Sequence, residues 1–152
     1  MPVYELPAIT DISLTNGAAK SCSGVTSPAT RRVKIRGIRF GGNSVTQTDP
    51  PVLVEIVTGF TAAGTSTGQT PQPAEIAETA SLCTGGTNWT VEPSGGSPVT
   101  RWADRISPIG GTLVYDIPVD QRPTMAVSQT AVVRCTSGSN LTNVRVGLIF
   151  EE

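Results

Sequence analysis

The chain has 152 residues, a formal net charge of −1, no histidine, 16 glycines and 12 prolines. This length fits one domain, and the many glycine and proline residues disfavour long helices. The small net charge provides no global attraction to nucleic acid or to anionic lipids, and no stretch reaches the roughly 18 apolar residues of a membrane span. We therefore expect neither nucleic acid nor a membrane as a partner.

Residues 1–9 are predicted to be extended, because Pro2 and Pro7 each bias the preceding residue away from helix. We interpret this segment as a short N-terminal arm or an edge strand, followed by a domain over residues 10–152. A frayed terminus is the alternative. As an arm it would bind a neighbouring chain by β-strand addition. Its apolar anchors would be Val3, Tyr4, Leu6 and Ile9.

Residues 31–40 alternate apolar and basic side chains, which is typical of a strand with one buried face. The apolar set changes parity at Gly37. A β-bulge at this glycine would bring the whole set onto a single buried face. The apolar residues of the segment are Val33, Ile35, Ile38 and Phe40.

The same segment holds the only cluster of like charges in the chain, and no acidic residue interrupts it. On a strand, Arg32, Lys34 and Arg36 would line one outward face. No aromatic residue lies between these basic residues, and single-strand nucleic-acid binders need such stacking platforms. An acidic protein surface as the partner, or an ordinary solvated face, is therefore favoured over nucleic acid.

Further segments are predicted to be strands from their period-two alternation, and the last of them alternates most strictly. Gly110-Gly111 is expected to form a turn, and one strand is expected to break near Ser128. The predicted strands cover residues 52–60, 99–106, 112–117, 125–135 and 144–151.

Residues 58–98 are polar and rich in Gly, Thr and Pro, so they are expected to form one long loop. Within it, residues 73–82 fit a short helix, since Pro73 suits the first helical position and Gly85-Gly86 would end it. Roughly six to eight short strands with Gly/Pro turns predict an all-β fold. The expected architecture is a single-domain, antiparallel, jelly-roll-like β-sandwich.

The sequence lacks several residue types and motifs that enzymes most often use for catalysis. The absence of histidine removes the commonest general base and metal ligand, and no phosphate-binding or zinc-protease motif occurs. Asp104, Asp116 and Asp120 lack the spacing of a glycosidase pair or a calcium loop, so we interpret them as solvated. We expect a non-enzymatic protein with no catalytic residue, cofactor or metal.

The cysteines and tryptophans leave alternatives open. Cys22, Cys83 and Cys135 are odd in number and widely spaced, which argues against a disulfide framework and against zinc. Free thiols in a reducing cytoplasm are expected, with a single disulfide as the alternative. Trp89 and Trp102 are expected in the core or at an interface, with ligand stacking as the alternative.

Several short segments form a combined pattern along the chain: residues 51–56, 64–68, 99–102, 107–111, 116–118 and 143–152. This pattern resembles the capsid decoration (cement) proteins of tailed bacteriophages, over residues 30–152. The resemblance implies a jelly-roll-like sandwich that sits as a homotrimer on the capsid exterior, with the major capsid protein as its partner. It implies a virion component assembled in the host cytoplasm, and no catalytic residue. The long loop and the Cys83 region depart from the pattern.

Apolar residues on the second face of predicted strands support a homotrimer. Leu53, Val57 and Ile149 are expected to be buried between subunits, because symmetric closure hides such residues. The alternative function is a head-fibre or host-glycan-binding β-sandwich module that would use Trp89 or Trp102.

Overall fold

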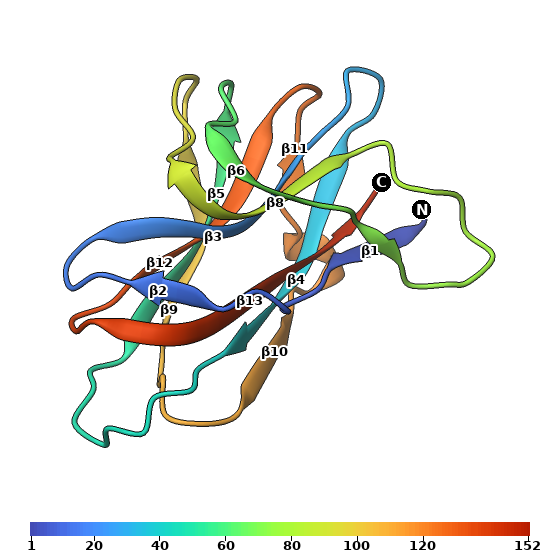
Figure 1. Cartoon of the computed structure of the whole chain (residues 1–152). Helices are drawn as coiled ribbons and strands as arrows, with labels where there is room; N and C mark the ends of the chain where they lie inside the picture. The colour runs from blue at the N-terminus through green and yellow to red at the C-terminus, as the bar shows by residue number, and fades with distance from the viewer.

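A computed structural model describes residues 1–152, apart from the side chain of Thr142. The protein is all-β, with 57% of its residues in strands and 2% helical. Two antiparallel sheets pack against each other (Figure 1). The predicted antiparallel β-sandwich is therefore confirmed.

The first sheet has seven strands. Along its main path they are β10 (Thr112–Asp116), β4 (Val33–Gly41), β13 (Leu141–Glu151), β1 (Val3–Leu6) and β7 (Gln72–Pro73). In addition, β11 (Thr124–Met125) pairs with β4, and β2 (Ile12–Leu14) pairs with β13. A short 3-10 helix, η1 (Val119–Gln121), precedes β11.

The second sheet has six strands. In spatial order they are β6 (Thr65–Gln69), β8 (Thr84–Val91), β3 (Ala19–Thr26), β12 (Thr130–Thr136), β5 (Val52–Phe60) and β9 (Val99–Ile106). Two of them, β5 and β9, have the bounds that were predicted from their alternation. The predicted break near Ser128 is also present, since this residue has a φ of 56° and separates β11 from β12.

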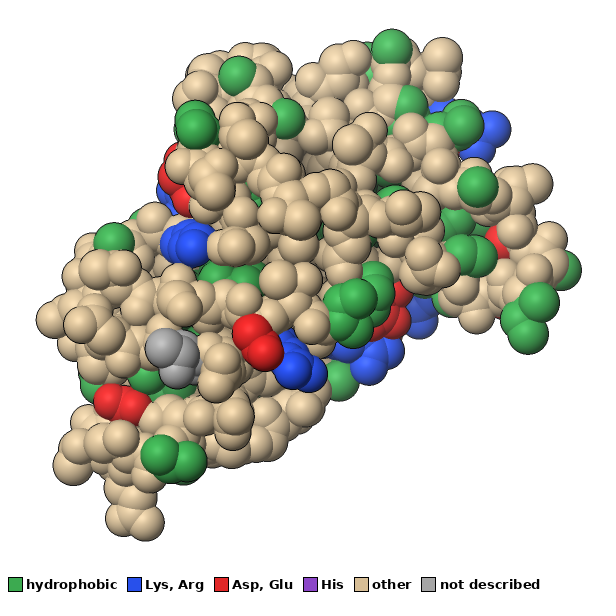
Figure 2. All heavy atoms as spheres, viewed as in Figure 1, with side chains coloured by type: hydrophobic (Ala, Val, Ile, Leu, Met, Phe, Trp, Pro, Cys, Tyr) green, Lys and Arg blue, Asp and Glu red, His purple; other side chains and the backbone are tan. Residues whose placement is uncertain are grey.

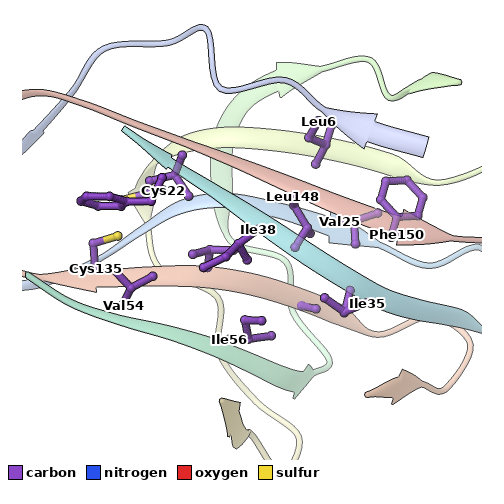
Figure 3. Packing of buried hydrophobic residues seen from close by; sticks show 14 of the residues in the cluster. Leu6, Cys22, Val25, Ile35, Ile38, Val54, Ile56, Cys135, Leu148 and Phe150 are labelled. Carbon is purple, nitrogen blue, oxygen red and sulfur yellow. The ribbon is translucent and has the colours of Figure 1, made fainter. Parts of the chain in front are cut away.

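The main core lies between the two sheets and takes apolar side chains from both (Figure 3). On β13 the alternation predicted from the sequence matches the structure, since every second side chain is buried. Burial of each such side chain stabilises the fold by roughly 1.5–3 kcal/mol. The buried β13 residues that lie on this face are Val144, Val146, Leu148 and Phe150.

The β-bulge predicted at Gly37 is present. Ile149 and Phe150 are consecutive on β13, but their partners on β4 are Gly37 and Ile35, so Arg36 is the extra residue. All four apolar side chains of β4 therefore face the core. A Cβ at Gly37 would also lie 2.3 Å from a backbone oxygen of β10, so the pairing with β10 requires glycine here.

The prediction of one long loop over residues 58–98 is wrong, because this stretch contains β6, β7 and β8. These strands are rich in Thr and Gly and carry little apolar alternation, so their burial pattern was not visible in the sequence. Their backbones nevertheless pair: β8 lies between β3 and β6. At Gly85 a Cβ would lie 2.3 Å from the Leu6 side chain, so close packing explains this glycine.

The short helix predicted over residues 73–82 is also wrong. Pro73 is extended in β7, where it pairs with Tyr4, and the following residues form bends and one turn. Ile76, the central apolar residue of the expected helix, is fully exposed. A helix this short is marginal unless it buries an apolar face, and the segment has none to bury.

A small second core lies on the outer face of the six-stranded sheet and consists of Val57, Phe60, Trp89 and Val132. Asn88 has a left-handed φ of 51°, at an irregularity in β8 just before this tryptophan. The Trp89 indole Nε1–H donates a hydrogen bond to the Ala63 carbonyl oxygen at 2.7 Å. The outer face is therefore partly covered by the chain itself.

We expect Gly24→Ala to lower the free energy of unfolding by about 1–3 kcal/mol, because overpacking strains a closely packed site. A Cβ there would lie 2.6–2.8 Å from atoms of Ala131, Val132 and Trp89. The control is Gly68→Ala on β6, where no heavy atom lies within 4 Å. Urea unfolding followed by tryptophan fluorescence compares the two, and equal effects would contradict the packing described here.

Candidate interaction surfaces

The N-terminal segment is a strand of this chain's own sheet. β1 pairs antiparallel with β13 on one side and with β7 on the other. Tyr4 and Leu6 are 1% and 0% exposed. The Tyr4 ring stacks on Phe150, with 5.7 Å between the ring centroids, and its hydroxyl donates to the Thr79 carbonyl oxygen at 2.9 Å.

The interpretation of residues 1–9 as an arm whose Tyr4 and Leu6 anchor a neighbouring chain is therefore wrong. Without β1, one edge of β13 would be unpaired, and the core would lose two of its large side chains. The N-terminal residues fill this position in their own subunit. Of the four proposed anchors, Val3 is half-buried and Ile9 is 68% exposed, so these two remain accessible to a partner.

We expect Leu6→Ala to lower the free energy of unfolding by about 2–5 kcal/mol, the usual cost of a cavity at a buried leucine. Ile9→Ala is the matched control and should change it by less than about 0.5 kcal/mol, because the side chain is exposed. Both values come from urea unfolding monitored by circular dichroism. A Leu6→Ala protein as stable as the wild type would show that β1 is not part of the core.

The basic residues of β4 meet acidic residues of β10, the adjacent strand, and of β1, which lies beyond β13, on the outer face of the seven-stranded sheet. Arg39 Nε lies 2.5 Å from Glu5 Oε1 on β1, and Arg36 Nε lies 3.4 Å from Asp116 Oδ1 on β10. Charged side chains are sparse on the face drawn in Figure 2, and several lie beside a charge of opposite sign. The sequence cluster is thus not a continuous basic surface.

Arg122 extends this ion-pair network. Its guanidinium lies 3.7 Å from Asp116 and also pairs with the carboxylate of Glu151. Among the residues that the structure describes, Arg32 and Lys34 form no ion pair, so two of the three proposed basic contact residues keep an unpaired charge. The third, Arg36, is engaged within the subunit.

The tryptophans differ in their surroundings. Trp89 is 5% exposed in the small second core, so it offers no stacking face to a ligand. Trp102 on β9 is half-buried, packs on the main core and stacks on Tyr115 of β10, with 4.9 Å between the ring centroids.

Val57 is 4% exposed in the same cluster as Trp89. The expectation that Val57 is buried between subunits is therefore wrong, because its own chain covers it.

β9 and β10 are the edge strands on one side of the sandwich, and residues 107–111 connect them. Each of these strands ends the order of its sheet, and the stacked Trp102 and Tyr115 rings join them. An edge strand presents unpaired backbone donors and acceptors to which another chain can bind. The exposed apolar side chains of this open edge are Val99, Ile109, Leu113 and Val114. We regard the open edge, defined by these strands and residues, as the strongest candidate interaction surface.

The opposite side of the sandwich has a similar arrangement, with a shorter connection between its two edge strands. β6 belongs to one sheet and β7 to the other, and only Thr70 and Pro71 separate them in sequence. The Gln69 side-chain amide adds a hydrogen bond to the Pro7 carbonyl oxygen at 2.7 Å. The sequence reasoning missed these two edge strands, because residues 58–98 were assigned to a loop.

Two of the aspartates are engaged by neighbouring groups, and the three cysteines are buried. Asp116 is engaged with two arginines, and the Asp104 carboxylate accepts from the adjacent Arg105 amide. Burial raises the pKa of the Cys83 thiol to about 12, which disfavours the nucleophilic thiolate. In the described part of the chain, no three His, Cys, Asp or Glu side chains gather as metal ligands. None of the described helical residues forms a span long and apolar enough to cross a membrane.

Comparison of the chain with protein-family models, curated proteins and solved structures found no match.

We expect none of the three thiols to react with Ellman's reagent in the folded protein at pH 8. All three are buried free cysteines, and the raised pKa of Cys83 leaves it almost entirely protonated at that pH. Absorbance of the released thiolate measures the reaction, with the protein unfolded in urea as the control in which all three react. Rapid reaction of a thiol in the folded protein would contradict the burial.

Proposed function

We propose that the protein is a capsid decoration protein of a tailed bacteriophage. In this role it binds the outside of the mature capsid as a homotrimer and stabilises it. The observation that carries the proposal is the open edge, where β9 and β10 leave apolar side chains and backbone groups without partners. The resemblance of the sequence segments to decoration proteins supports the same function.

A trimer makes use of such an edge. In a threefold arrangement, the edge of one subunit contacts a different surface of the next, and the ring closes after three contacts. Val114 and Leu113 would be removed from water there, as expected for exposed apolar residues at an interface. The proposed trimer uses β9 and β10 in place of Val57, which is buried within the subunit.

Contact with the major capsid protein is assigned to residues that remain accessible. Arg32 and Lys34 have no ion pair among the described residues, and they favour an acidic surface on the shell. Ile9 is an exposed apolar group that adds area to such a contact. A ligand that binds only the assembled, mature shell stabilises that state by mass action, so this role requires a rigid scaffold and no active site.

We expect Val114→Lys to convert a trimeric wild-type protein into a monomer, because a lysine would place a charge in the apolar contact. Val45→Lys is the matched control. Val45 is 91% exposed in the loop between β4 and β5 and does not lie on β9 or β10, so that variant should remain trimeric. Size-exclusion chromatography with light scattering measures the mass of each protein.

Co-sedimentation with purified mature capsids tests the second half of the proposal. Wild-type protein and Val45→Lys should bind and raise the temperature at which the capsids break, whereas Val114→Lys should bind more weakly. A monomeric wild type contradicts the trimer, and a trimeric Val114→Lys protein contradicts the assignment of the open edge. Wild-type protein that fails to bind capsids contradicts the decoration function.

A further inference from the structure

A polar hollow of about 390 Å³ lies at the end of the sandwich where three strands of the seven-stranded sheet meet. The strand register places Arg145 of β13, Gly41 of β4 and Thr112 of β10 in one row. Because Gly41 has no side chain, the row is open in its middle. The other residues that line the hollow are Asp11, Gly42, Asn43, Gly111 and Asn143.

The fold does not require a glycine at position 41. Its backbone is not left-handed, and the nearest atoms to a Cβ there, both of Arg145, would lie at 3.9 Å, an ordinary van der Waals distance. The neighbouring Gly42 is different, because a Cβ would lie 2.4 Å from the Pro108 carbonyl oxygen. Packing would therefore allow a larger residue at position 41, on the floor of the hollow, whereas close contacts require glycine at position 42 in the adjoining loop.

The charged groups of the hollow are held in place before any ligand binds. Arg145 Nε donates to Asp11 Oδ1 at 2.6 Å, and Arg145 Nη2 lies 3.4 Å from Asp11 Oδ2. This pair lowers the pKa of the Asp11 carboxyl, so the group is ionised at neutral pH. Both side chains are about half exposed, which leaves further donor and acceptor positions free for a ligand.

The lining selects a class of ligand by its chemistry. It offers a carboxylate, a guanidinium, two side-chain amides, a hydroxyl and glycine backbones, and none of the described lining residues has an apolar side chain. The two charges of Asp11 and Arg145 cancel, which disfavours a strongly ionic ligand. Vicinal hydroxyl groups act as donors and acceptors at once, so they can satisfy both kinds of lining group.

We propose that this hollow is a carbohydrate-binding site, which takes one sugar residue of a surface glycan. The sugar hydroxyls would donate to Asp11 and accept from Arg145, while Asn43, Asn143 and Thr112 complete the contacts. None of the described lining residues is aromatic, so the affinity of one site is expected to be in the millimolar range typical of a few net hydrogen bonds. This site does not depend on the decoration function.

The test is a nuclear magnetic resonance titration of the ¹⁵N-labelled protein with glucose, galactose, mannose, rhamnose and N-acetylglucosamine, and separately with inorganic phosphate. The expected result is saturable shifts for at least one sugar, confined to the amides around Gly41, Gly111 and Asn143. The proposal is overturned if no sugar produces such shifts, if the shifts lie elsewhere, or if phosphate alone produces them.

Two variants connect the shifts to the hollow. Gly41→Leu fills the floor and should abolish binding, whereas Gly68→Leu, on β6 of the other sheet and also without close neighbours, should leave it unchanged. Thr112→Val removes one hydroxyl from an exposed strand position and should weaken binding about three- to tenfold. The Thr112 variant keeps the test valid if Gly41→Leu does not fold. Unchanged affinity in Thr112→Val and Gly41→Leu would overturn the site.

Discussion

The bulge at Arg36 and Gly37 is the constraint on which the seven-stranded sheet depends. In a regular strand the change of parity would turn either Ile35 or Ile38 toward solvent, because successive side chains alternate between faces. The extra residue returns both to the core. Glycine at position 37 also admits the backbone of Tyr115, which a Cβ would approach to 2.3 Å. The pairing of β4 with β13 and its pairing with β10 therefore rest on the same residue.

On the outer face of this sheet, ion pairs with residues of other strands neutralise part of the basic cluster. The basic residues of β4 are consecutive in their outward positions, yet Glu5 and Asp116 arrive on strands from both sides and pair with Arg39 and Arg36. Exposed pairs of this kind contribute little to stability. Their larger effect is on recognition, because they cancel a potential that would otherwise attract acidic partners over the whole face.

Exposed apolar side chains on the edge strands β9 and β10 locate the candidate protein-contact surface. The two-residue connection from β6 to β7 bridges one side, while β1 occupies the position beside β13 that an external strand would otherwise take. On the other side, residues 107–111 connect the edge strands β9 and β10, and Leu113 and Val114 of β10 are exposed. The polar hollow lies at one end of the seven-stranded sheet, where Gly41 leaves a gap between Arg145 and Thr112. The apolar edge suits a protein contact, and the hollow suits a small polar ligand.

The residue order by itself determined the fold class, the bounds of β5 and β9, the buried face of β13 and the bulge in β4. A strand that is buried on one face alternates apolar and polar residues, so these features could be predicted from the sequence. Strands β3 and β8 left no such record, because Ser, Thr and Gly pair through their backbones and carry few apolar side chains. Which strands become neighbours was equally absent from the local pattern. Only the tertiary structure decided that Tyr4 and Leu6 are buried in the core of this chain, that Glu5 pairs with Arg39, and that β9 and β10 are edge strands. Each of these outcomes depends on contacts between segments far apart in the chain, which no local periodicity encodes.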